Sequence, residues 1–450
     1  MSAFPQSSES TVSHWQATNR GRDSLYGHNK DASVPHEADI VIVGGGTMGV
    51  SLAYFLTREG AEGAGKKVVV LEARDVGSGG SSKTKNQTST SGVDASAKTP
   101  LINNCSVNET KKGSDVQVAR YHTWLAAREK YGLTAAHGTT LITDPDEAKK
   151  VSRFNQAYSC QLRPAASVHS HRLCTALMRK AIESSYSDCQ LFTHAPVTSI
   201  DKTDDGKWNV KTAKGDVKAG RVVLCTNAYT KNFYDPEKKD EELLHSHIRP
   251  AYAQCSLITP PPTYSGLNAL KHTYNADGSF YLVQTPSGGI VLGGWNLPLV
   301  KGREKTYQRV GNDDDSCVMP QWTKFLANYC KTRFANWGDQ VHGEGATRTW
   351  SGLMTDSKDA LPLVGEVPGK DGMFLSAGFH GHGQSRIIIV AQGLAGILKT
   401  GQWASQLPVS FQLTMERLER SRHVETVLDE YSDLKEEIGD VAMQVESMIR

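Results

Sequence analysis

The order of apolar and polar positions predicts a folded body that begins near Ala38. Residues 39–43 form a short run rich in β-branched side chains, as expected of a buried strand. A glycine cluster at 44–49 follows, and residues 50–58 then place apolar side chains at helical spacing. Residues 68–71 form a second apolar run that ends at Glu72. The pattern therefore predicts a strand, a glycine turn, a helix and a second strand.

Further along the chain the period of the apolar positions changes several times. Helical spacing recurs at 114–131, 171–185, 322–334 and 378–399, the last of these after a glycine turn. We expect the first two of these helices to flank the first sheet. Strand-like runs fall at 197–202, at 207–225 with a hairpin turn at 214–216, and at 248–295, where Pro and Gly separate short strands as in an antiparallel sheet.

Three segments lack such a pattern. Residues 77–114 are dominated by Ser, Thr, Lys, Asn and Gly, which predicts a long loop that is either disordered or a lid. The head of the chain, to about Glu37, is polar with isolated aromatic residues and predicts an arm on the surface. Residues 415–450 are highly charged and predict a solvated helix or pair of helices, with a dimer seam as the less favoured alternative.

The charge balance and the cysteine pattern narrow the class of protein. The 450 residues contain 50 Lys and Arg against 48 Asp and Glu, so no strong field attracts nucleic acid or a membrane surface, and we expect a small-molecule partner. No run of about 18 apolar residues and no signal peptide is evident, which predicts a cytoplasmic protein. The eight cysteines form no CxxC pair or Cys/His cluster, so we expect reduced thiols and no metal site. The sequence leaves the oligomeric state open.

The strongest chemical signal is the GxGxxG pattern between the predicted first strand and helix. Gly44 allows a tight turn, Gly46 lets the backbone approach a pyrophosphate, and Gly49 lets helix and strand pack closely. The helix N-terminus offers free N–H groups to the phosphates, and Glu72 would accept the ribose hydroxyls. The pattern predicts a dinucleotide site but does not separate NAD from FAD. Its candidate residues are Gly44, Gly46, Thr47, Met48, Gly49 and Glu72.

Four segments in the same order resemble the D-amino-acid oxidase family, which includes glycine oxidase, sarcosine oxidase and their fungal relatives. The resemblance runs from about Asp39 to Gly401 and is closest to a fungal-type member. It implies an α/β (α+β) fold in which a Rossmann-like FAD-binding domain is interleaved with an antiparallel-sheet substrate domain. The segments are 39–79 with Glu72-Ala-Arg-Asp-Val-Gly-Ser-Gly79, Val222-Val-Leu-Cys-Thr-Asn-Ala-Tyr-Thr230, residues 348–365, and Ser376-Ala-Gly-Phe-His-Gly-His-Gly383.

The resemblance also implies a division of the chain. We expect an arm at 1–37, a first FAD-binding part at 38–115 that contains the loop 77–114, and further FAD-binding elements with helical insertions at 116–247. The substrate domain then covers 248–345, a closing FAD-binding part covers 346–412, and a charged helical tail covers 413–450.

Further cofactor contacts follow from the resemblance. It places Val197, Thr226 and Asn227 beside the adenine and pyrophosphate, and a later glycine turn at the flavin ring and ribityl chain. Such a turn before a helix N-terminus puts N–H donors where negative charge develops on a reduced flavin. The remaining residues that we assign to the cofactor on this basis are Ala73, Arg74, Ser81, Ser82, Gly381, His382 and Gly383.

Departures from the family change the expected chemistry. The family's flavin-linking histidine is absent from residues 80–86, and no cysteine lies near 350–359, so we expect FAD to be held non-covalently. The oxygen-activating lysine of relatives falls at Val291, and their carboxylate-binding lysine at Ser385. Both the electron acceptor and amino-acid specificity are therefore open.

The leading functional hypothesis is oxidation of a C–N bond in a small amine or amino-acid-like metabolite, by hydride transfer to flavin N5 with O2 as acceptor. Oxidation of a C–OH group is the alternative, and a flavin-binding protein without catalysis or an NAD-dependent dehydrogenase are further ones. Lys83 and Lys85 are additional candidates, His380 and His382 could instead be packing residues, and Trp350 could be core or pocket wall. The catalytic candidates are Arg348, His380, His382 and Arg386.

Overall fold

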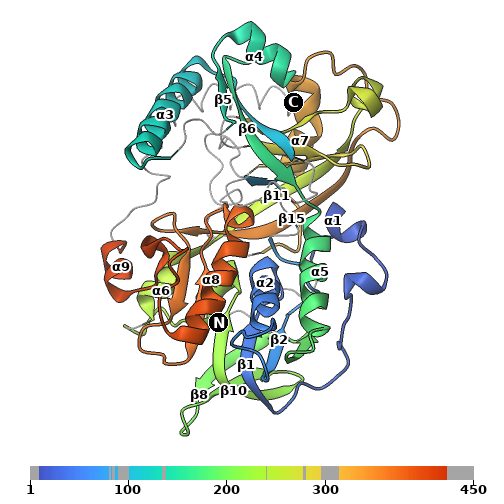
Figure 1. The fold of residues 1–450 in the computed structure, drawn as a ribbon. Helices are drawn as coiled ribbons and strands as arrows, with labels where there is room; N and C mark the ends of the chain where they lie inside the picture. The colour runs from blue at the N-terminus through green and yellow to red at the C-terminus, as the bar shows by residue number, and fades with distance from the viewer. Residues whose placement is uncertain are drawn as a thin grey trace.

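Two β-sheets with their helices make up the part of the chain that the computed structural model describes: residues 10–80, 83, 87–89, 101–133, 138–239, 241–276, 280–294 and 314–422. In Figure 1 one sheet occupies the lower half of the molecule and the other the upper half. The strands of the two sheets alternate along the sequence, so each sheet is assembled from distant segments.

The first sheet has a parallel centre in the order β17-β10-β1-β2-β7, with β16 antiparallel on β17. Strand β1 is buried at its centre, where Val41 and Ile42 are inaccessible, because neighbours cover both its edges and both its faces. The hairpin β9–β10, with β8 on β9, extends this sheet as predicted around residues 214–216. The strands are β1 Glu37–Val43, β2 Lys67–Leu71, β7 Asp188–Phe192, β8 Val197–Lys202, β9 Trp208–Thr212, β10 Gly215–Leu224, β16 Leu363–Glu366 and β17 Met373–Ala377.

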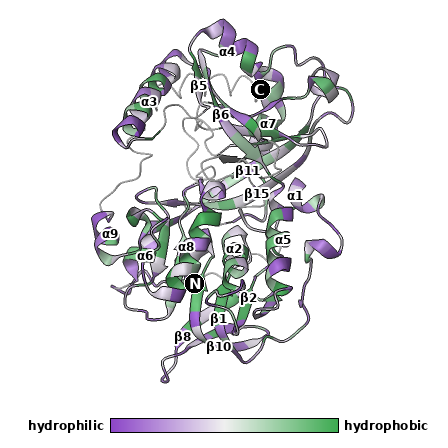
Figure 2. Cartoon of the chain, viewed as in Figure 1, coloured by the Kyte–Doolittle hydropathy of each residue, from purple (hydrophilic) through white to green (hydrophobic). Residues whose placement is uncertain are grey.

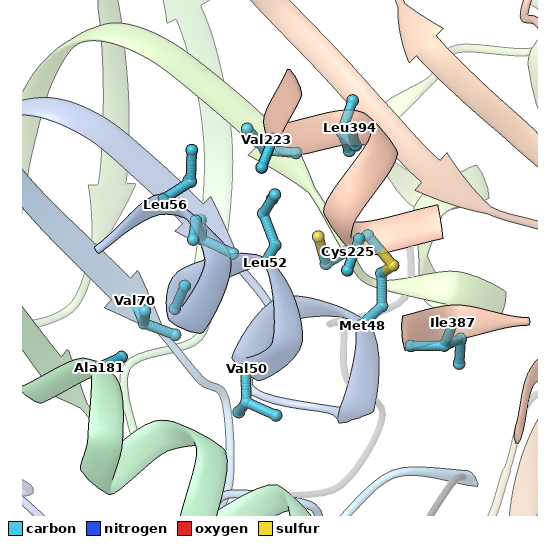
Figure 3. Close-up of a cluster of buried hydrophobic side chains, with 14 of the residues drawn as sticks. Met48, Val50, Leu52, Leu56, Val70, Ala181, Val223, Cys225, Ile387 and Leu394 are labelled. Carbon is cyan, nitrogen blue, oxygen red and sulfur yellow. The ribbon is translucent and has the colours of Figure 1, made fainter. Parts of the chain in front are cut away.

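Three helices cover one face of this sheet: α2 Thr47–Leu56, α5 Ser170–Ile182 and α8 Ile387–Thr400. Helix α2 is the innermost, since it packs against both of the others and against the strands (Figure 3). Its side chains Val50 and Leu52 have no exposed surface. The short helices α6 Glu242–His247 and α9 Met415–Arg420 contribute to the core on the opposite face.

The second sheet has the order β15-β11-β14-β13-β12-β4-β6-β3, with β5 on β6. Among the described residues, neighbouring strands of this sheet are antiparallel except for the parallel pair β12–β4. Helix α7 Pro320–Arg333 packs against it through Trp322 and Phe325, and α4 Pro145–Ser152 covers β6. The strands are β3 Gln87–Ser89, β4 Leu101–Asn108, β5 Thr140–Ile142, β6 Ser159–Ser167, β11 Ile248–Thr259, β12 His272–Ala276, β13 Phe280–Gln284, β14 Ile290–Gly294 and β15 Gly345–Ser357.

The predicted fold class is confirmed, but the prediction of a single loop over 77–114 is wrong. Strand β4 lies in this range, and helix α3 Lys111–Lys130 begins within it. Strand β4 pairs with β6 and β12, which lie far away in the sequence, so its polar sequence gave no local signal. Helix α3 does not flank the first sheet either, because it lies at the edge of the second sheet (Figure 1). Figure 2 shows that this helix is largely hydrophilic.

The arm before β1 contacts both the second sheet and helix α5 of the first sheet. Helix α1 His14–Ala17 places Trp15 against Trp350 of the second sheet, and Trp15 is only 3% exposed. On the other side of the arm, Asn19 contacts His171 and Thr175 of α5. The domain boundaries predicted above stay a proposal. Residues 116–247, predicted to be FAD-binding elements with helical insertions, also contain β5 and β6 of the second sheet.

Candidate functional site

A cavity lies where the carboxyl ends of β1, β2 and β10 meet the turn after β17 and strand β15. Open sheets of this type bind ligands at the carboxyl ends of their strands, where the order of strands reverses. Most of the predicted cofactor residues line it. They are Gly44, Gly46, Thr47, Met48, Glu72, Ala73, Arg74, Val197, Thr226, Asn227, Gly381 and Gly383.

The turn between β1 and α2 is shaped by glycines. Gly44 has a φ of +107°, and a Cβ atom there would lie 2.8 Å from the carbonyl oxygen of Cys225. A Cβ atom on Gly49 would lie 1.8 Å from the carbonyl oxygen of Gly44, so helix and strand approach as closely as predicted. Gly46 lines the cavity and has open space around its Cβ position. The N-terminus of α2 therefore faces the cavity with room for a phosphate next to its free N–H groups.

The end of β2 supplies a carboxylate to the same cavity. Glu72 accepts hydrogen bonds from the backbone N–H of Gly45 at 2.6 Å and of Arg74 at 2.8 Å. Burial raises the pKa of Glu72, and these two N–H groups oppose the rise. The carboxylate is therefore fixed beside the glycine turn, as a ribose acceptor requires.

Arg74, next along the chain, belongs to a buried cluster of charges. Its guanidinium binds both carboxylate oxygens of Asp315, at 2.8 and 3.1 Å, and the ammonium of Lys83 lies 3.2 Å from the same carboxylate. Burial lowers the pKa of Lys83 to about 8, against the opposing effect of Asp315. For Asp315, burial works toward a higher pKa, but the hydrogen bond from Arg74 and the charge of Lys83 outweigh it and hold the pKa below its ordinary value.

Two turns from different parts of the first sheet are joined directly. Asn227, which follows β10 with a φ of +46°, accepts a hydrogen bond on its side-chain oxygen from the N–H of Gly378, at 3.2 Å. Gly378 opens the turn after β17, and the same turn carries Gly381 and Gly383 into the cavity. The turn after β10 and the glycine turn after β17 therefore border one cavity.

The two histidines of the second turn do not line the cavity in the described part of the chain. His380, at a φ of +46°, accepts the N–H of Ser357 on Nδ1 at 3.2 Å, and His382 holds its Nδ1 2.6 Å from the carbonyl oxygen of His380. The rings lie parallel, 5° apart in plane, at 6.5 Å. The turn's backbone and Gln384, rather than its imidazoles, face the cavity.

The two arginine candidates also lie away from the cavity lining. Arg348 is exposed on β15 and donates to the carbonyl oxygen of Val12 in the arm at 3.4 Å. Arg386 stands at the start of α8 with its guanidinium 5.8 Å from the ring of Phe411, and burial lowers its pKa. The four catalytic candidates are thus not brought together in the cavity, because each is held by a local contact elsewhere.

The structure also places one further residue of the sequence analysis. Trp350 is core: it has no exposed surface, and its Nε1 donates to the carbonyl oxygen of Lys83 at 2.6 Å. Ser81, Ser82 and Lys85 lie outside the described residues.

Sequence reasoning missed part of the cavity wall. Tyr229 and Phe233 follow the Thr226-Asn227 turn in the 3₁₀ segment Asn227–Phe233, and their aromatic side chains after a recognised turn were an available signal. Leu353, Met354 and Thr355 also line the cavity. They belong to the segment 348–365 that resembles the family, from which the sequence analysis takes Arg348 as the candidate. Asp315 had no signal, because the partners of its carboxylate, Arg74 and Lys83, lie more than 200 positions away.

Within the described ranges, no group of three or more His, Cys, Asp and Glu side chains is placed to hold a metal ion. Among the same residues, no helix is long and apolar enough to cross a bilayer.

Comparison with known proteins gives a family match over most of the chain. The model of the DAO family, described as FAD dependent oxidoreductase, matches residues 39–396. Mitochondrial dimethylglycine dehydrogenase of Mus musculus is 24% identical over 441 residues, which cover 91% of this chain and 47% of that protein. The chain thus spans about half the length of this curated relative.

Solved structures show the same fold. Glycine oxidase from Geobacillus kaustophilus has a TM-score of 0.65 at 18% identity, over 85% of this chain and 99% of that one. L-alpha-glycerophosphate oxidase from Mycoplasma pneumoniae, solved with FAD bound, has a TM-score of 0.60 at 14% identity, over 84% of this chain and 100% of that one. Identities this low show the fold alone.

Proposed function

The chain belongs to the family of FAD-dependent oxidoreductases, and we propose that it oxidises a C–N bond of a small amine or amino-acid-like metabolite with a non-covalently held FAD and O2 as acceptor. The family match covers the glycine turn, the end of β2 and the turn after β17 together. The chain is therefore an enzyme that uses FAD. The substrate bond that it oxidises, its electron acceptor and the non-covalent attachment of FAD are the proposed parts.

The observation that supports the FAD site is one cavity bordered by both glycine turns. Gly46 leaves open space at the N-terminus of α2, which suits a pyrophosphate, and Glu72 stands where a ribose would need an acceptor. Gly381 and Gly383 border the same cavity. These residues fit FAD, which supplies the two-electron chemistry when it is bound.

The wall near the second turn suits a small substrate of mixed polarity. It combines the apolar side chains of Leu353, Met354 and Phe379 with the hydroxyl of Thr355 and the amide of Gln384. An apolar wall with a few polar groups is typical of small-molecule sites, because it excludes water while it orients the ligand. The protein's own part in the reaction is to bind and orient the substrate and to keep water out.

The cavity also supports non-covalent attachment. Among the described residues that line it, no histidine occurs and Cys225 is the single cysteine. Burial raises the pKa of the Cys225 thiol, which keeps it a poor nucleophile.

The preference for a C–N bond rests on relatives. Dimethylglycine dehydrogenase and glycine oxidase are both named for amino-acid substrates. A fungal-type assignment stays a prediction, and so does a cytoplasmic location, since the curated relative is mitochondrial.

Oxidation of a C–OH group is a second candidate, and one observation favours it. Neither Arg348 nor Arg386 lines the described cavity, so no arginine of the described wall other than Arg74 could bind a substrate carboxylate. One structure of the same fold is an oxidase named for glycerophosphate, which is not an amine.

Anaerobic reduction of the bound FAD separates the two candidates. The purified protein is mixed with a panel of N-methylated and primary amino acids and amines, and in parallel with polyols and 2-hydroxy acids, while absorbance near 450 nm is followed. We expect bleaching by one or more of the amines, and hydrogen peroxide on admission of air. Bleaching by the hydroxy compounds alone would replace the proposal with its alternative.

A further inference from the structure

The cluster of Arg74, Lys83 and Asp315 places two cations on one carboxylate in an almost fully buried position. The exposed fractions of the three side chains are 8%, 0% and 2%. Asp315 is itself fixed, because its backbone carbonyl accepts a hydrogen bond from the hydroxyl of Ser351 at 2.9 Å. Charges in such a position are poorly screened by solvent and act over longer distances than surface charges do.

Lys83 lies directly behind the wall of the FAD cavity. Its backbone N–H donates to the carbonyl oxygen of Gly80, which lines the cavity. Its Cβ would be 2.9 Å from a Cβ on Gly352, the neighbour of the lining residue Leu353. Arg74, which shares Asp315 with it, lines the cavity too.

A contact between Lys83 and the substrate is excluded by its burial, so its charge must act through the wall. A buried ammonium is costly unless an anion compensates for it, and Lys83 shares the carboxylate of Asp315 with Arg74, on which Glu72 also acts. Burial lowers the pKa of Lys83 to about 8, which is consistent with a charge that Asp315 compensates only in part. An anion in the adjacent cavity would complete the compensation.

We propose that Lys83, held by Asp315 behind the cavity wall, raises the reduction potential of the bound FAD. Two-electron reduction at neutral pH adds two electrons and one proton to the flavin, which leaves one additional negative charge in the cavity. A fixed positive charge nearby stabilises this form over the oxidised one. The inference rests on the FAD site of the proposed function and is independent of the substrate and of the acceptor.

The test is the midpoint potential of the bound FAD, measured at pH 7 with redox dyes and no substrate. Lys83→Met and Lys83→Gln both remove the charge, and the second keeps a hydrogen-bonding group near Asp315. We expect reduced FAD to lose about tenfold or more in binding relative to oxidised FAD in both variants, equivalent to a potential about 30 mV lower. FAD content and thermal unfolding are recorded for each variant.

Asp315→Asn separates a charge effect from a structural one. It breaks the same ion pairs but removes a negative charge, so we expect a potential that does not fall. A purely structural role predicts that all three variants move the potential in the same direction, and that result would overturn the proposal. So would an unchanged potential in the two Lys83 variants, or loss of oxidised FAD from both of them. Because no substrate is used, failure here leaves the proposed reaction untouched, and the bleaching panel tests that reaction separately.

Discussion

Single glycines in the turn between β1 and α2 serve two separate purposes. Gly44 and Gly49 allow backbone segments to approach more closely than any Cβ atom permits, so they are required by the folded protein itself. Gly46 has no such neighbour, and its missing side chain leaves room in the cavity. The two purposes can be separated by substitution.

Gly46→Ala should weaken FAD binding while the protein without FAD stays folded. The new methyl group meets no atom of the chain but occupies the space beside the N–H groups of α2. We expect FAD affinity to fall roughly tenfold or more, or about 1.4 kcal/mol. Titration of the apoprotein with FAD, followed by flavin fluorescence, measures it.

Two further substitutions serve as controls for this prediction. Gly396→Ala, in α8 with open space around its Cβ position, should leave FAD affinity unchanged and stabilise the helix by about 0.5–1 kcal/mol. Gly49→Ala should instead destabilise the protein even without FAD, because its Cβ would overlap the carbonyl oxygen of Gly44. Equal FAD affinities for Gly46→Ala and the unaltered protein would contradict our assignment of the pyrophosphate site.

The effect of Lys83 on the reduction potential of FAD should depend on pH. Burial lowers its pKa to about 8, so its charge is lost as the pH rises through that value. The difference in FAD potential between the unaltered protein and Lys83→Met should therefore be full near pH 7 and shrink above about pH 8. Among the described residues, the charged groups that act on Lys83 are Asp315 and Arg74, which both proteins share. A difference that stays constant to pH 10 would contradict the role given to Lys83.

Residues that belong to a local pattern can be singled out from the sequence, whereas residues fixed by distant partners cannot. Gly44, Gly46 and Glu72 act within one strand–turn–helix–strand unit, whose pattern is visible in the sequence. Arg348 belongs to a recognised segment, yet it lies in the exposed first part of β15, before the cavity-lining residues 353–355, and donates to the carbonyl oxygen of Val12. Asp315 depends on contacts across the whole chain and could not have been found.

At the scale of elements, strands made by distant pairing were the hardest to predict. Strand β4 has little apolar alternation, but β6 and β12 supply partners for it on both edges. Helices α5, α7 and α8 were predicted because each buries an apolar face, and α8 follows its glycine turn as expected. Tertiary pairing thus overrode local propensity at β4, as is common for strands.

The junction between β15 and α9 predicts how stability depends on pH. Arg417 of α9 binds both oxygens of Asp359, at 2.7 and 3.0 Å, and His247 lies 3.4 Å from the same carboxylate. Burial acts to raise the pKa of Asp359, but the nearby His247 and the hydrogen bonds from Arg417 outweigh it and hold this pKa below its ordinary value. The carboxylate therefore stabilises the fold above about pH 4 and loses this effect as the pH falls further.

Asp359→Asn should reduce the free energy of unfolding by about 3 kcal/mol at pH 7, because it leaves the buried Arg417 without its counter-charge. Its stability should also change less than that of the unaltered protein between pH 6 and about pH 3. Asp201→Asn, which removes an exposed pair with Lys211, is the control and should cost less than about 1 kcal/mol. Urea unfolding at several pH values measures both, and equal losses would contradict a special role for Asp359.

At the scale of the whole molecule, the cavity exists because the chain crosses repeatedly between two sheets. The first turn comes from the start of the chain and the second from beyond residue 377, and the parallel order β17-β10-β1-β2 brings them to one edge. Strand β15 of the second sheet closes the cavity from the other side. The resemblance of four segments to one family predicted this arrangement, whereas periodicity alone predicted only its separate elements.

The central claim is that both glycine turns hold one non-covalent FAD. The most direct measurement is the visible spectrum of the purified chain, saturated with FAD and freed of excess, before and after acid precipitation. We predict flavin bands with about one FAD per chain, all of it released to the supernatant as intact FAD. A colourless protein, or flavin that stays with the precipitate, would contradict the account.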